Sequence, residues 1–175
     1  NGVDFQSSGT FNGLIAGTHT VTIRDANMCT SSVVVTITQP SAVSGSIVSQ
    51  TNVTCHGGNN GSVTVSGSGG TPPYMYRING GTYQSSGTFN GLIAGTHTVT
   101  IRDSNMCTSN VVVTITQPST VSGSIVSQTN VSCHGGNNGS VTVLGSGGIG
   151  PYKYSLNGVD FQSSGTFNGL IAGTH

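Results

Sequence analysis

Apolar and polar residues alternate along most of the chain, in short segments separated by glycine, asparagine and proline. The segment "GSVTVSG" (61–67) shows the pattern clearly, because every second residue is a valine or a glycine. Such alternation is typical of a β-strand that buries one face. Further segments with strand character are 74–80, 96–103 and 110–117, with weaker ones at 43–50 and 83–92. No segment has the spacing of an amphipathic helix, so the pattern predicts an all-β protein.

The pattern repeats every 78 residues. The fourteen residues "QSSGTFNGLIAGTH" begin at Gln6, Gln84 and Gln162, and the cysteines and Gln-Pro pairs recur at the same offset. A fixed period indicates that each copy is one structural unit. We therefore predict tandem immunoglobulin-like β-sandwiches with a 78-residue period. The Gln-Pro pairs divide the chain into the end of one repeat, a complete repeat and the start of a third: residues 1–39, 40–117 and 118–175.

The first and the last nineteen residues are identical, because they lie two periods apart. Residues 1–39 contain only the later strands of a repeat, and residues 118–175 contain only the earlier ones. Neither part can bury its apolar face alone. We therefore expect the chain to be a window of a longer array, in which further copies of the same repeat are its partners in a fibre.

Differences between the copies are concentrated in one region. Residues 53–83 and 131–161 differ at ten positions, nine of which lie in the last eighteen residues of the segment. In this region Tyr74, Tyr76 and the position of Ile78 stay apolar while the residues between them change. Alternation then places the first set in the core and the second in solvent. The variable turn and the outward positions beside it form a candidate surface-contact loop: Thr71, Pro72, Pro73, Met75 and Arg77.

Charged residues make up only 5% of the chain, and its formal net charge is zero. The cations are Arg24, Arg77, Arg102 and Lys153, and the anions are Asp4, Asp25, Asp103 and Asp160. Without a basic groove or a polybasic patch, nucleic acid and anionic membrane surfaces are poor partners. No apolar run reaches the ~20 residues that span a bilayer, so we expect no membrane insertion in this segment and expect targeting signals outside it.

Few residues have the type and spacing that chemistry requires. A histidine follows a cysteine at His56 and at His134, but no four zinc ligands recur within one repeat. Asp25 and Asp103 begin turns in which one carboxylate caps the backbone, which is a thin ligand set for calcium. His97 lies at an inward strand position, as a core or corner residue would. We therefore predict that the chain is not an enzyme and holds no metal or cofactor.

Two stretches of the central copy carry a family resemblance. They are "VTCHGGNNGSVTVSGSGGTPPYMYRING" and "GLIAGTHTVTIRDSNMCTSNVVVTITQP". Their Gly/Asn turn after a cysteine, their Pro-Tyr turn and their "D-x-N-x-C-T" motif resemble the SprB-type repeat of giant cell-surface adhesins in gliding Bacteroidota. Met28 and Met106 stand where that repeat usually has glycine, and His97 where it has tyrosine. The resemblance implies an extracellular location at the cell surface.

Each repeat carries two cysteines, and an even number per extracellular unit favours disulfides. If the segments are counted as six up-and-down strands, the turn after the first and the turn before the last lie at the same end. This count predicts a disulfide between Cys55 and Cys107, with Cys29 and Cys133 paired to residues outside the window. If residues 83–92 are two strands, the alternative is a bond between Cys29 and Cys55.

Two functions agree with these observations. The first is a structural repeat segment of a long extracellular filament or adhesin stalk, which serves gliding motility or surface attachment. The alternative is a multivalent module in which each repeat makes weak contacts with a glycan, such as surface polysaccharide. Stacking of similar units in series favours the first function. The absence of tryptophan and of a convergent aromatic or charged cleft counts against the second.

Overall fold

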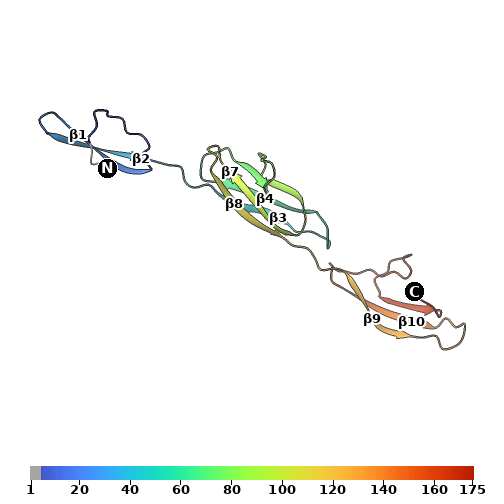
Figure 1. Cartoon of the computed structure of the whole chain (residues 1–175). Helices are drawn as coiled ribbons and strands as arrows, with labels where there is room; N and C mark the ends of the chain where they lie inside the picture. Colours follow the sequence, from blue (N-terminus) through green and yellow to red (C-terminus); the bar gives the residue numbers. More distant parts are fainter. Residues whose placement is uncertain (1–4) are drawn as a thin grey trace.

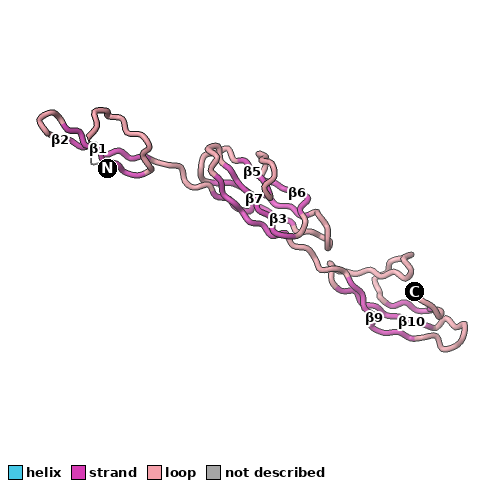
Figure 2. Tube along the Cα trace, in the orientation of Figure 1, coloured by secondary structure: helices cyan, strands magenta, loops and turns pink. Residues whose placement is uncertain are grey.

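The computed structural model describes residues 5–175, which form three β-rich bodies in a row (Figure 1). Short extended segments join the bodies, and strands and loops but no helices occur in the described chain (Figure 2). The strands are β1 (Gly17–Arg24), β2 (Thr30–Ile37), β3 (Ser44–Thr51), β4 (Gly61–Ser68), β5 (Met75–Ile78), β6 (Thr88–Leu92), β7 (Gly95–Arg102), β8 (Thr108–Ile115), β9 (Ser122–Thr129), β10 (Gly139–Ser146) and β11 (Thr166–Leu170). Among residues 5–175 there is no helix long and apolar enough to cross a membrane.

The central body is a sandwich of two three-stranded antiparallel sheets. One sheet has the order β3-β4-β6, and the other has the order β5-β7-β8. Apolar side chains from both sheets and from one loop form a single buried core: Val53, Val63, Val65, Tyr76, Phe89, Leu92, Val99, Ile101, Val113 and Ile115. The predicted fold class, tandem immunoglobulin-like β-sandwich repeats, is confirmed.

Burial along the strands follows the alternation in the sequence. Val113 of β8 is 0% exposed, whereas its neighbour Val112 is 62% exposed. In the β5 region Tyr76 is buried, and Tyr74 and Ile78 pack against the core. The core positions of this region are therefore those that the period of two predicts.

Gly45 allows strand β3 to lie directly against the opposite sheet. A Cβ atom added there would overlap Cδ1 of Ile101 and would lie 2.9 Å from Cγ2 of Val111. Any larger residue would push the sheets apart, since buried side chains have little room to move. At this place the backbone of β3 covers the core.

Residues 83–92 form two passes of the chain instead of the single weak strand that the alternation suggests. Gln84 exchanges two backbone hydrogen bonds of 2.8 Å with Tyr76, in antiparallel fashion. The chain then reverses, and β6 runs antiparallel to β4. The Gln84 amide holds the reversal by donating to the carbonyls of Ser86 at 2.8 Å and Thr88 at 3.0 Å. The run of serine and glycine after Gln84 was the turn signal in the sequence.

The chain enters and leaves the central body at opposite ends. At the entry end, before β3, the Gly70 amide donates to the carbonyl of Ser41 at 2.7 Å. At the exit end, after β8, the Val53 amide donates to the carbonyl of Thr116 at 2.9 Å. The β4–β5 loop and the β7–β8 turn lie at the entry end, and the β3–β4 loop lies at the exit end.

The first and third bodies each contain half of the same sandwich. The hairpin β1-β2 corresponds to β7-β8, and the sheet β9-β10-β11 corresponds to β3-β4-β6. Ile23 in the first body is 59% exposed, whereas the equivalent Ile101 is 0% exposed. Val35 is likewise 36% exposed, against 0% for Val113. An inner face is thus buried only where the complementary sheet lies against it.

We predict that Val113→Ala destabilises the central body much more than Val112→Ala. Val113 is 0% exposed and Val112 is 62% exposed, so the same truncation removes buried packing at only one of them. The expected loss in unfolding free energy is about 2 kcal/mol for Val113 and less than about 0.5 kcal/mol for Val112. Urea denaturation of the whole chain, with amide exchange read at β7 and β8, measures both. Equal losses would contradict the assigned inner face of β8.

Candidate functional site

The carboxylate of Asp103 organises the entry end of the central body. Its Oδ1 accepts the backbone N–H groups of Asn105 at 2.9 Å and Cys107 at 2.8 Å, which shapes the β7–β8 turn. Its Oδ2 accepts the N–H of Thr71 at 2.9 Å. Asp103 is 3% exposed, and a buried carboxylate is tolerated when charge-assisted hydrogen bonds replace its hydration. One side chain therefore ties the variable loop to the turn.

The residues singled out as a surface-contact loop lie at this entry end and along β5. Pro72 and Pro73 are exposed in the loop, and Thr71 is half-buried at its base. Met75 and Arg77 follow on β5 and are half-buried. A role of this loop in surface contact stays a prediction.

Hydrogen bonds hold the base of the loop in place. The carbonyl of Thr71 accepts from the amide and from the hydroxyl of Ser104, both at 2.9 Å. The Asn105 side chain donates to the Thr71 hydroxyl at 3.0 Å. The hydroxyl of Tyr74 donates to the carbonyl of Gly69 at 2.5 Å. The exposed prolines therefore rest on a fixed base.

Two arginines beside this loop converge on one aromatic ring. The Cζ atoms of Arg77 and Arg102 lie 4.7 Å and 3.9 Å from the centroid of the Tyr83 ring. Arg77 lies opposite Thr100, and Arg102 lies opposite Met75, in the β5–β7 pairing. The arginines are thus diagonal neighbours on the outer face of the sheet. The sequence analysis did not single out Tyr83. Its position carries an aromatic residue in each copy, and this recurrence was the available signal.

The predicted disulfide between Cys55 and Cys107 is not present, and both residues are exposed free thiols. Cys107 precedes β8 at the entry end, whereas the Cys55 loop is tied at the exit end, where the Gly57 amide donates to the Gln117 side chain at 2.8 Å. The eight residues of β8 separate these ends by roughly 25 Å, far beyond the Cα separation that a disulfide permits. The strand count was wrong because residues 83–92 make two passes, which moves the last turn to the other end.

The alternative pair of Cys29 and Cys55 has no better geometry. Cys29 lies in the turn before β2, at the end of the first body that is remote from the linker. Cys55 lies at the exit end of the next body, so the length of both bodies separates them (Figure 1). Cys29 and Cys133 are also exposed free thiols, and their pairing with residues outside this sequence stays a prediction.

The histidine of the central core is held by hydrogen-bond partners at both ring nitrogens. His97 is 7% exposed, and its Nε2 lies 3.0 Å from the carbonyl of Ile93. Its Nδ1 lies 3.0 Å from the side-chain nitrogen of Asn79, so both ring nitrogens have partners at the corner of the sandwich. His56 and His134 are exposed in the loops that follow their cysteines. Among residues 5–175, no three His, Cys, Asp or Glu side chains gather where they could hold a metal ion.

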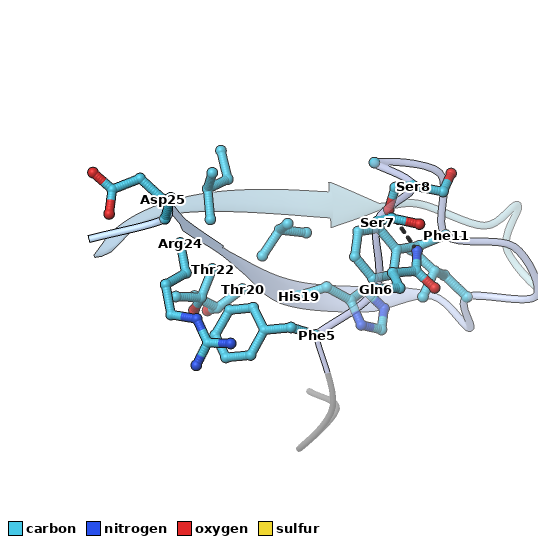
Figure 3. Close-up of a pocket in the computed structure, with 15 residues that line it drawn as sticks. Phe5, Gln6, Ser7, Ser8, Phe11, His19, Thr20, Thr22, Arg24 and Asp25 are labelled. Atoms are coloured by element: carbon cyan, nitrogen blue, oxygen red, sulfur yellow. Dashed lines mark hydrogen bonds between the residues drawn. The ribbon is translucent and has the colours of Figure 1, made fainter. Parts of the chain in front are cut away.

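A hollow in the first body extends along its open half-sandwich (Figure 3). Phe11 and His19 line it. Their equivalents in the central body, Phe89 and His97, are 8% and 7% exposed because the second sheet covers them. The part of the hollow lined by Phe11 and His19 is therefore the place of a core, whereas Phe5 and Arg24 line it from the outer face.

We predict that Asp103→Ala is more destabilising than Asp25→Ala. Asp25 begins the equivalent turn and accepts from Asn27 at 2.9 Å and Cys29 at 2.8 Å, but it is exposed and holds no loop. Removing Asp103 leaves three donors without their acceptor, so we expect a loss of about 3 kcal/mol, against about 1 kcal/mol for Asp25.

Urea denaturation measures these losses, and amide exchange at Thr71 and Cys107 reports the loop and the turn separately. Faster exchange at Cys107 with unchanged exchange at Thr71 would contradict the tie between turn and loop.

Two segments of the chain match the model of a known repeat family. The SprB repeat model matches residues 47–83 and residues 125–161, which are the same part of two consecutive units. The matched segments begin 78 residues apart, in agreement with the period of the sequence. No curated protein matches the chain. Two consecutive units of this chain therefore match the SprB repeat, as the resemblance in its sequence indicated.

Proposed function

We propose that this protein is a structural segment of a long extracellular filament or adhesin stalk at a bacterial cell surface, where it serves gliding motility or surface attachment. The family supports the proposal, because the SprB repeat suggests a gliding-motility surface adhesin. The partners of each unit are then further copies of the same repeat, which complete the half-sandwiches.

The observation that carries the proposal is that the chain enters and leaves a repeat at opposite ends. Ser41 is bound at the entry end by Gly70, and Gln117 is bound at the exit end by Gly57. Units connected in this way extend in a line, whereas entry and exit at one end would fold the chain back on itself. The row of bodies in Figure 1 follows from this connection.

The joint between units is short. Gln117 is tied to the central body, and the carbonyl of Ser119 accepts from the Gly148 amide of the next body at 2.8 Å. Only Pro118 lies between these two anchored residues, and its ring restricts the backbone. We propose unit boundaries at the Gln-Pro pairs, with units of residues 1–39, 40–117 and 118–175. The axial repeat is then on the order of 40 Å, from strands of ~3.3 Å per residue plus the joint.

The first and last strands of the central repeat are fastened to each other. The Gln50 amide donates to the carbonyl of Thr114 at 2.7 Å, and the Thr116 amide donates to the Asn52 side chain at 3.1 Å. Val53 adds a backbone hydrogen bond to Thr116. These strands, β3 and β8, run in the same direction and carry the two linkers. Tension along the fibre therefore shears the three bonds together instead of opening them one at a time, which suits a load-bearing stalk.

Cryo-electron tomography of intact cells, with an antibody against the repeat, tests the filament. We expect labelled fibres with a beaded axial period on the order of 40 Å. A strain that lacks the gene controls for antibody specificity. Label on the cell surface without fibres of this period would contradict the stalk.

Force spectroscopy tests the fastening. We predict that Gln50→Ala lowers the force at which the central body unfolds and raises its unforced unfolding rate about fivefold, the effect of losing ~1 kcal/mol of hydrogen bonding. Gln128→Ala is the matched control, because the Gln128 side chain donates to Asn130 of its own strand region at 2.9 Å and lies outside the central body. Equal forces for wild type and Gln50→Ala would show that β3 and β8 do not share the load.

A further inference from the structure

Two of the three arginines of the chain lie together on the outer face of the central body. Both guanidinium groups lie against Tyr83, at 4.7 Å for Arg77 and 3.9 Å for Arg102. All three residues are half-buried, so part of each side chain is open to solvent. The cluster lies beside the variable loop, in the region where the copies differ most.

The first body contains the equivalent stack of the hairpin arginine. There Arg24, the equivalent of Arg102, lies 4.0 Å from the ring centroid of Phe5 (Figure 3). One arginine over a plain phenyl ring is therefore enough for the stack. In the third copy, Ser155 and Phe161 stand at the positions of Arg77 and Tyr83. Relative to the third copy, the arginine at position 77 and the phenol hydroxyl of Tyr83 are additions of the central repeat.

No acidic side chain of the same repeat is available to neutralise this pair of charges. Asp103 is the single acidic residue among residues 40–117. Its carboxylate is buried and is occupied by the amides of Thr71, Asn105 and Cys107. The Nε atom of Arg77 is buried and has no hydrogen-bond partner. Two like charges that share one ring repel each other, and an anion bound between them would remove that repulsion.

We propose that Arg77, Arg102 and the Tyr83 hydroxyl form a binding site for the carboxylate or sulfate groups of an acidic polysaccharide. Guanidinium groups pair with such oxyanions through two parallel hydrogen bonds. The phenol supplies a further donor at the same place. The site adds a contact function to the proposed stalk, and it rests on the surface location of that stalk for its biological ligand.

A polymer of charged sugars suits this site better than a membrane does. The chain has a formal net charge of zero, so no broad positive surface attracts anionic lipid headgroups. A single pair of arginines binds one anionic group weakly, but a polysaccharide offers many such groups to the repeats of an array. Binding at those repeats of an array that carry the same pair, which the third copy with Ser155 does not, raises the overall affinity through effective concentration.

Titration of the 175-residue chain with polygalacturonate tests the site, with side-chain NMR signals of the arginines and Tyr83 as the readout. We expect saturable shifts at Arg77, Arg102 and Tyr83, and none with neutral dextran. Arg77→Ser should weaken binding about fivefold or more, since charge-assisted bonds are lost. Tyr83→Phe should weaken it by a smaller factor. Each substitution installs a residue that the third copy already has at that position, so the fold is retained.

Arg24→Ser is the matched control, because it removes the same charge from a stack without a second arginine. Binding unchanged by Arg77→Ser, or weakened equally by Arg24→Ser, would overturn the proposal, since only general charge attraction would then remain. Arg77-dependent binding to phosphatidylserine vesicles, without binding to polygalacturonate, would overturn it in favour of a lipid surface. These measurements use the isolated chain, so their outcome is independent of whether tomography finds filaments.

Discussion

Each sheet of this protein has one apolar face, and only the other sheet of the same sandwich covers it. Ile101 and Val113 are fully buried between the two sheets, whereas the equivalent Ile23 is 59% exposed where one sheet is missing. The six-stranded repeat is therefore the smallest unit that closes its own core. That core is small for a sandwich, so polar fastenings matter more than in a larger domain. Asp103 supplies one at the entry end, and Asn52 supplies another at the exit end.

The sequence predicts the faces of the strands well and their number less well. Alternation identifies Tyr76 and Val113 as core residues, because side-chain direction in a strand depends only on local geometry. It does not show where a polar segment reverses. Residues 83–92 contain such a reversal, between the pass at Gln84 that pairs with Tyr76 and strand β6. Because of this one reversal, every later turn lies at the opposite end of the sandwich from the end that the strand count predicts. The predicted pairing of Cys55 with Cys107 depended on it, and the two thiols lie at opposite ends of the sandwich.

The candidate site is predictable to a similar extent. Comparison of the copies leads to the loop at Thr71 and to the outward Arg77, because positions outside the core vary freely. It also marks Tyr83, which is Phe161 in the next copy, but it does not show that this ring reaches Arg77 and Arg102, because that contact depends on the fold of the 79–87 segment. The buried role of Asp103 was missed in the same way. Its turn motif predicts the bonds to Asn105 and Cys107, but the bond to Thr71 joins residues 32 apart in the sequence.

Separation of the core from the outer face explains how one scaffold accommodates different surfaces. The positions of Val63, Val99 and Ile115 decide whether the sheets pack, and the positions that join units lie at the two ends. Arg77 and Met75 belong to neither group, so the exchange to Ser155 and Lys153 in the next copy falls outside the core positions and outside the joints between units. In the proposed array, the outer positions of successive repeats lie at a regular distance from one another. In the proposed fibre, variation at a few outer positions then changes the surface chemistry while the length and connection of the units stay the same.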